Sequence, residues 1–147
     1  MDTQPAATPQ WGKGIVDAAR FSAATERALA HGENRAIVLV QLEGAPDAAV
    51  AAAEARLLRT VRPGDLIGRL GEDRFAVLAE TNADPRAGRR VASSLASRIS
   101  GRLREPYHIG GEKLWLAPRV GMAFAEGDAD TAAHLLQRAE ERSQPPG

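Results

Sequence analysis

The fold of this chain is decided by the stretch Arg62-Pro-Gly-Asp-Leu-Ile-Gly-Arg-Leu-Gly-Glu-Asp-Arg-Phe-Ala-Val-Leu78. Pro63 and Gly64 form a turn-making pair, and the apolar runs 66–70 and 75–79 flank a short Gly-acidic segment. Apolar runs of this length, bounded by turn residues, are typical of strands. The stretch therefore predicts a β-hairpin whose tip carries charged side chains.

Alternating helices and strands precede this hairpin. An Ala-rich segment predicts a helix over 17–31, closed by Gly32, because glycine commonly follows a helix end. The continuous apolar run 36–40 is rich in β-branched residues and predicts a central strand covered on both faces. Asp47 can cap a second helix that runs to about residue 59.

The clearest helix follows the hairpin. Asp84 is a good N-cap and Pro85 suits the first helical position. Apolar residues then recur along one helix face, at Val91, Leu95, Ile99 and Leu103. This pattern predicts a long helix packed on the sheet.

The last third of the chain predicts a second hairpin and a final helix. Gly110-Gly111 indicates the turn, and the second arm, 114–124, alternates apolar and polar residues. Pro118 within this arm implies an edge position or a bulge. The final helix is predicted to be capped by Asp128 or Asp130 and to bury its apolar face, Leu135, Leu136 and Ala139.

Composition indicates one domain without a metal or cofactor. The 147 residues are 44% hydrophobic, and 19 Lys and Arg balance 19 Asp and Glu, which recommends neither nucleic acid nor an anionic membrane as a partner. There is no cysteine, and the three histidines show no ligand spacing. We therefore predict no metal site.

The ends of the chain predict tails around a single unit. Residues 1–13 and 143–147 are polar, Pro-bearing and non-periodic, so we expect both to be flexible, with one domain over 14–142. The first residues lack the pattern of a signal peptide, and no apolar run is long enough to span a bilayer. The sequence predicts a cytoplasmic location.

The predicted order α-β-α-β-β-α-β-β-α describes an α+β domain with helices covering a largely antiparallel sheet. With a Gly-acidic turn at the central hairpin, it resembles the diguanylate cyclase (GGDEF) domain family. The resemblance implies the nucleotidyl-cyclase-like, palm-like fold. It rests on fragments in the family's order: Gly14-Ile15-Val16-Asp17 with Phe21, Gln41-Leu42-Glu43, Gly71-Glu72-Asp73-Arg74-Phe75, Val120-Gly121-Met122-Ala123 and Leu135-Leu136-Gln137-Arg138-Ala139-Glu140.

Several residues depart from what the resemblance requires for catalysis. Family members use two divalent cations, which need anionic oxygen ligands, whereas Gln41 stands at the first ligand position. Glu43 and Asp73 could still ligate, but Arg74 replaces the acidic fourth residue of the signature turn and brings a cation to it. Glu72 replaces a glycine that leaves room for the nucleotide.

The strand-to-helix connection is also shortened. Gly44-Ala45-Pro46-Asp47 stands where the resemblance implies guanine- and phosphate-binding segments. We therefore predict a catalytically inactive domain, a pseudo-enzyme without catalytic residues. The alternative for the Gly71–Phe75 turn is an ordinary solvated turn with charged tips.

One family feature is retained. Arg62 and Asp65 match, in sequence and spacing from Gly71, the inhibitory RxxD site for cyclic di-GMP. An arginine fork can bind the O6/N7 edge of guanine while a carboxylate accepts from its N1 and amino hydrogens. Such sites need a second basic group, and Arg86 and Arg90 share one face of the next helix. The alternatives are a purely structural turn and a solvated helix face.

Two classes of function stay open. The domain can be a receptor for cyclic di-GMP that passes the signal to a protein partner. It can instead be a nucleotide-independent module for dimerisation or docking. Titration of cyclic di-GMP against wild type and Arg62→Ala separates the two.

Overall fold

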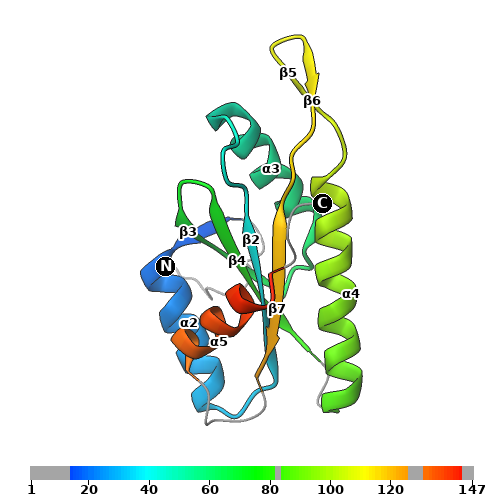
Figure 1. The fold of residues 1–147 in the computed structure, drawn as a ribbon. Helices are drawn as coiled ribbons and strands as arrows, with labels where there is room; N and C mark the ends of the chain where they lie inside the picture. The colour runs from blue at the N-terminus through cyan, green and yellow to red at the C-terminus, as the bar shows by residue number, and fades with distance from the viewer. Residues whose placement is uncertain (1–13, 82–83, 126–130, 144–147) are drawn as a thin grey trace, which may run out of the picture.

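The structure, a computed structural model, describes residues 14–81, 84–125 and 131–143. Seven strands and four helices follow one another along these ranges (Figure 1). Their bounds are β1 Ile15–Asp17, α2 Ala18–Ala30, β2 Arg35–Gln41, α3 Asp47–Thr60, β3 Leu66–Gly71, β4 Arg74–Glu80, α4 Pro85–Leu103, β5 Tyr107–Ile109, β6 Glu112–Leu114, β7 Arg119–Phe124 and α5 Ala132–Glu141. This is the predicted α+β class.

The main sheet has five strands in the order β1-β3-β4-β2-β7. Strand β1 runs parallel to β3, and the other neighbours are antiparallel, so the sheet is largely antiparallel as predicted. Strand β2 lies between β4 and β7 with residues 36–41 paired on both sides. The apolar run therefore forms a central strand.

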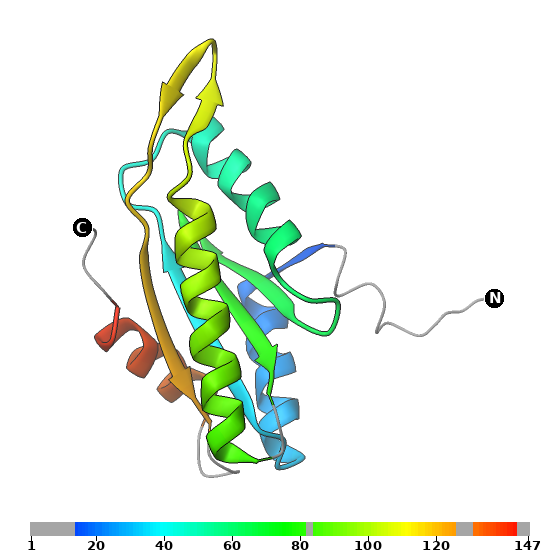
Figure 2. The same ribbon diagram turned by 90° about the vertical axis from the view of Figure 1, so that its right-hand side faces the viewer.

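Helices cover both faces of this sheet (Figures 1 and 2). Side chains alternate along β2, so Val38 and Val40 pack with α3 and α4, whereas Ile37 and Leu39 pack with α2 and α5. Leu95, predicted to face the core, is at most 1% exposed, as are Leu57 and Phe21. Among the described helices, none is long and apolar enough to cross a membrane.

The helix caps are partly as predicted. Asp17 and Asp84 accept hydrogen bonds from the backbone N–H groups of Arg20 and Arg86, and Pro85 begins α4. The prediction that Asp47 caps α3 is wrong, because Pro46 occupies the N-cap position and Asp47 is already helical. A carboxylate there still interacts favourably with the helix dipole, so the helix begins as expected.

The second hairpin is shorter than predicted. Strands β5 and β6 form a separate two-stranded sheet, and the arm 114–124 is interrupted after Leu114 and resumes at Arg119 as an edge strand of the main sheet. Pro118 lies in the gap, where its missing N–H costs no ladder hydrogen bond. Helix α5 is capped by Thr131, which accepts from the His134 N–H, and not by Asp128 or Asp130, which lie outside the described residues.

Tyr107 attaches the small hairpin to the domain. Its ring is 1% exposed, its hydroxyl donates to the Leu103 carbonyl at 2.7 Å, and the Arg56 guanidinium lies 3.8 Å from the ring centroid. Burial raises the pKa of the Tyr107 hydroxyl despite the nearby arginine. The hairpin projects beyond the main sheet from this anchor (Figure 2).

Candidate functional site

The turn at Arg62–Asp65 joins α3 to β3 and is held by a buried carboxylate. The Asp65 N–H donates to the Arg62 carbonyl at 2.9 Å. The Arg62 N–H donates to Asp65 Oδ2 at 3.0 Å, and the Glu80 N–H donates to Asp65 Oδ1 at 3.2 Å. Asp65 is only 1% exposed. Direct contact between Asp65 and a ligand therefore stays a prediction, and it requires this turn to open.

Arg62 extends from the turn towards α4. One guanidinium nitrogen donates to the Glu80 carbonyl at 2.8 Å, and Nε lies 3.7 Å from Asp65 Oδ2. The side chain is nevertheless 48% exposed. It lines an open concavity of about 440 Å³ with Arg90 and Arg98 from α4. Ala87, Val91, Ser94 and Leu95 complete the lining.

The structure distinguishes between the predicted arginines of α4. Arg90 lies in the concavity with Arg62, whereas Arg86, one helical turn earlier, does not line it. Arg98, which was not predicted as a site residue, does. The helical spacing from Arg90 to Arg98 could have indicated it, but only packing decides which direction along α4 the turn faces. Within the described ranges, neither Arg90 nor Arg98 has a side-chain hydrogen bond or ion pair.

A second cluster lies where β2 ends. Gln41 is the register partner of Arg74 in β4 and of Arg119 in β7, so the three side chains share one sheet face. Gln41 is 8% exposed. Gln41 Nε2, Arg74 Nε and Arg119 Nε are buried without a hydrogen-bond partner among the described residues. This row presents donors where the resemblance implies metal ligands.

The two arginines of this row form ion pairs with carboxylates outside it. Arg74 Nη2 lies 2.6 Å from Glu140 Oε1 of α5, and Arg119 Nη1 lies 3.8 Å from Glu43 Oε1. Glu43, a candidate ligand, is 68% exposed and faces an arginine.

The Gly71–Phe75 turn is held closed by Arg69. This guanidinium donates to the carbonyls of Gly71 at 3.1 Å and Glu72 at 2.8 Å, and pairs with Glu54 of α3 at 3.0 Å. Arg69 thus binds the backbone carbonyl of Glu72. The Asp73 carbonyl accepts from the Leu42 N–H at 2.8 Å, which fastens the turn to the end of β2.

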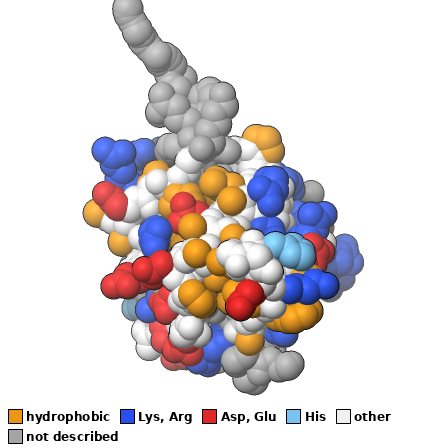
Figure 3. Space-filling view, turned by 90° about the horizontal axis from the view of Figure 1, so that it is seen from above, with side chains coloured by type: hydrophobic (Ala, Val, Ile, Leu, Met, Phe, Trp, Pro, Cys, Tyr) orange, Lys and Arg blue, Asp and Glu red, His pale blue; other side chains and the backbone are white. Residues whose placement is uncertain are grey.

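These residues do not fit a pair of divalent cations. Magnesium binds carboxylate oxygens, whereas Gln41 and Arg74 face each other at this edge with an amide and a guanidinium. Over residues 14–81, 84–125 and 131–143, no three His, Cys, Asp or Glu side chains converge as a metal site would need. Figure 3 views the molecule from the end that carries the β5–β6 hairpin and shows acidic, basic and hydrophobic side chains interspersed.

Comparison with known proteins identifies the family. A family model described as diguanylate cyclase, GGDEF domain, matches residues 43–144. An uncharacterized signaling protein of Caulobacter vibrioides is 29% identical over 132 residues, which are 82% of this chain and 16% of that protein. MucR of Pseudomonas aeruginosa, a bifunctional diguanylate cyclase/cyclic di-GMP phosphodiesterase, is 32% identical over 87 residues, 58% of this chain and 12% of MucR. The chain thus spans a small part of these relatives.

Solved structures of GGDEF family proteins have a similar fold. The GGDEF domain of YfiN (TpbB) from Pseudomonas aeruginosa superposes with a TM-score of 0.75 at 26% identity, covering 87% of each chain. A sensory box/GGDEF family protein from Caulobacter crescentus gives 0.71 at 26% identity, covering 89% of this chain and 92% of that one. Because the family model spans more than half of the chain and the fold agrees with these structures, the chain belongs to the GGDEF domain family of diguanylate cyclases.

Proposed function

We propose that this chain is a catalytically inactive GGDEF-type signalling domain that binds cyclic di-GMP in the concavity between the Arg62 turn and α4. The proposal rests on one observation: Arg62 lines the same concavity as Arg90 and Arg98. The side chains of Arg90 and Arg98 have no hydrogen-bond or ion-pair partner among the described residues. Two unneutralised cations beside the half-exposed Arg62, at the wall of a concavity, are suited to an anionic ligand.

The chemistry of the concavity fits a guanine dinucleotide. Arginine forks bind phosphate oxygens or the O6/N7 edge of guanine through two parallel hydrogen bonds. Ala87, Val91 and Leu95 offer apolar surface for a base between these charges. In this proposal Asp65 holds the turn that presents Arg62, and its carboxylate contacts the ligand only if the turn rearranges.

Loss of catalysis is supported by the other end of the sheet. Gln41, Arg74 and Arg119 form a row of donors at the position that the resemblance gives to metal ligands. A guanidinium repels the cations that would activate the ribose hydroxyl. Purified protein with GTP and Mg²⁺ is therefore expected to form no cyclic di-GMP, measured by chromatography of the nucleotides. Product that disappears in Asp73→Ala would contradict the proposal.

The binding test is a calorimetric titration of cyclic di-GMP against three single variants. Arg62→Ala and Arg90→Ala should each weaken binding about tenfold or more, because each removes a charge-assisted hydrogen bond of about 1.5–3 kcal/mol. Arg86→Ala is the matched control, since Arg86 is on the same helix outside the concavity. It should bind as wild type does. No binding by wild type, or equal binding by Arg62→Ala, sinks the proposal.

The second candidate is a nucleotide-independent docking or dimerisation module. It is favoured by Trp115, which follows β6 and is 62% exposed, the one large hydrophobic side chain this exposed among the described residues. Exposed tryptophan is common at protein interfaces. A homodimer seen by light scattering, lost in Trp115→Ser and indifferent to cyclic di-GMP, would favour this function.

A further inference from the structure

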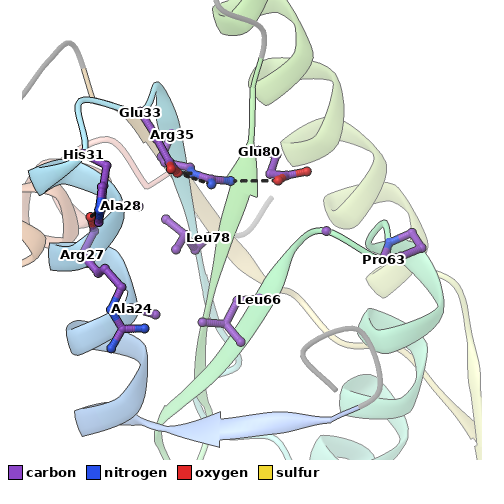
Figure 4. A pocket seen from close by; sticks show the side chains of 11 residues that line it. Ala24, Arg27, Ala28, His31, Glu33, Arg35, Pro63, Leu66, Leu78 and Glu80 are labelled. Atoms are coloured by element: carbon purple, nitrogen blue, oxygen red, sulfur yellow. Dashed lines mark hydrogen bonds and ion pairs between the residues drawn. The ribbon is translucent and has the colours of Figure 1, made fainter. Parts of the chain in front are cut away.

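A second cavity lies on the opposite face of the sheet, beneath α2. It has a volume of about 250 Å³ and is bounded by α2, the ends of β3 and β4, and the Pro63-Gly64 turn (Figure 4). Its apolar wall consists of Ala24, Ala28, Pro63, Leu66 and Leu78. A cavity of this size is smaller than the ~300–1,000 Å³ of drug-sized sites, so it suits a small ligand.

The charged side chains at the rim are unequally satisfied. Arg35 pairs with both Glu33 and Glu80, at 3.4 Å from the latter, so one arginine serves both carboxylates (Figure 4). The His31 ring donates from Nδ1 to the Arg27 carbonyl at 2.7 Å. The Arg27 guanidinium has no hydrogen bond or ion pair within the described ranges. The Arg35 cluster thus keeps one negative charge in excess, and Arg27, on α2, is the cation of this rim that no described carboxylate engages.

The Arg27 side chain lies where it can bind a molecule in this cavity. Figure 4 shows its side chain running along α2 beside Ala24, on the side towards Leu66. Leu66 and Leu78 are 2% and 4% exposed, so they form the fixed floor of the cavity, and Ala24, Ala28 and Pro63 supply the rest of its apolar wall. A ligand with an apolar body and one anionic head would bury its body against this wall while its head binds the guanidinium.

We infer that the cavity beneath α2 is a binding site for a small amphipathic carboxylate, recognised by Arg27 and by the apolar wall of Leu66 and Leu78. The volume excludes a dinucleotide, and the ion pairs of Arg35 leave Arg27 to bind the head. The site differs from the concavity at Arg62 in chemistry and lies on the other face of the sheet. It stands whether or not the domain binds cyclic di-GMP.

The test uses octanoate as the probe and octanol as its uncharged counterpart, each titrated into the full chain by NMR. Octanoate should shift the amide resonances of Ala28, Leu66 and Leu78, and leave those of Arg90 and Arg98 unchanged. Octanol should bind about fivefold to tenfold more weakly, because it lacks the charge that Arg27 recognises.

Two variants and a matched control complete the test. Arg27→Gln keeps most of the side chain and should weaken octanoate about fivefold to tenfold, whereas Arg20→Gln, on the same helix away from the cavity, should have no effect. Ala24→Leu should abolish binding by filling the cavity, with an unchanged circular dichroism spectrum. Absence of octanoate binding, equal affinity for octanol, or unchanged affinity in Arg27→Gln would each overturn the inference. Titration of cyclic di-GMP into Arg27→Gln should match wild type, which keeps this result separate from the proposed function.

Discussion

The Arg62–Asp65 turn and the Gly71–Phe75 turn stand at the two ends of strand β3, and arginines dominate both. At the Gly71–Phe75 turn the cations are engaged: Arg69 holds two carbonyls and Glu54, and Arg74 pairs with Glu140. At the Arg62–Asp65 turn, Arg62 is joined across a concavity by Arg90 and Arg98, which no described residue neutralises.

The difference shows how the arginines of this domain can be sorted. A guanidinium that binds carbonyls and a carboxylate of its own chain has a structural use that needs no ligand. A cation that lines a concavity without a counter-charge is repelled by neighbouring cations, which slightly destabilises the fold. The same cation can bind an anion that enters the concavity. By this criterion Arg69 and Arg74 are structural, and Arg62 is partly so, because it binds the Glu80 carbonyl and lies beside Asp65. Arg90 and Arg98 mark the concavity in which a ligand is expected.

The largest expected effect is on stability, at Asp65. Asp65→Ala removes the acceptor for the Arg62 and Glu80 N–H groups and should lower the free energy of unfolding by about 2 kcal/mol, measured by urea denaturation. Asp65→Asn, which keeps one acceptor oxygen, should lose about half as much. If Asp65→Ala is as stable as wild type, the carboxylate does not hold the turn and is available to a ligand.

A smaller effect is expected at Arg74. Arg74→Ala breaks the ion pair with Glu140, whose side chain is 53% exposed, and should cost about 1 kcal/mol or less in the same assay. The double variant with Glu140→Ala gives the coupling energy of the pair. A coupling near zero would mean that Arg74 is as little engaged as Arg90 and Arg98, and the comparison between the turns would fail.

The smallest effect is expected at Arg90. Because Arg90 has no partner among the described residues, Arg90→Ala should change the free energy of unfolding by no more than about 0.5 kcal/mol. The same variant is expected to lose cyclic di-GMP affinity. A large loss of stability would assign Arg90 to the fold and remove the reason for placing it in a binding site.

Much of the fold follows from local sequence. The apolar runs of β2, β3 and β4 and the Asp84-Pro85 start of α4 specify their own secondary structure, and the structure confirms them. Strand β1 was missed because three residues carry too little pattern, and its pairing of Ile15 with Ile67 depends on the rest of the sheet. The helix face of α4 shows the same limit: Gly88 and Ala92 are buried in it, while Val91 is only half-buried.

The candidate site was less accessible to sequence reasoning. Pro63-Gly64 indicated the turn, and the spacing of Arg62 and Asp65 indicated the RxxD resemblance. Neither showed that Asp65 faces inward and binds two backbone amides. Nor could spacing along α4 tell Arg86 from Arg98, since both lie near Arg90 on the helix surface. The cavity at Arg27 is lined by residues of α2, β2, β3 and β4 and of the turn before β3, so no local sequence pattern could predict it.

Gly64 lines the cavity beneath α2 and lies in the same turn as Arg62. A Cβ atom at this position would clash with Glu80 Oε1, and that carboxylate would have to swing aside. The Glu80 carboxylate pairs with Arg35 beneath α2, while its backbone carbonyl accepts from Arg62 on the other side. A methyl group at residue 64 should therefore change the shape of the cavity beneath α2 while leaving the hydrogen bond of Arg62 in place, because that bond uses the Glu80 backbone.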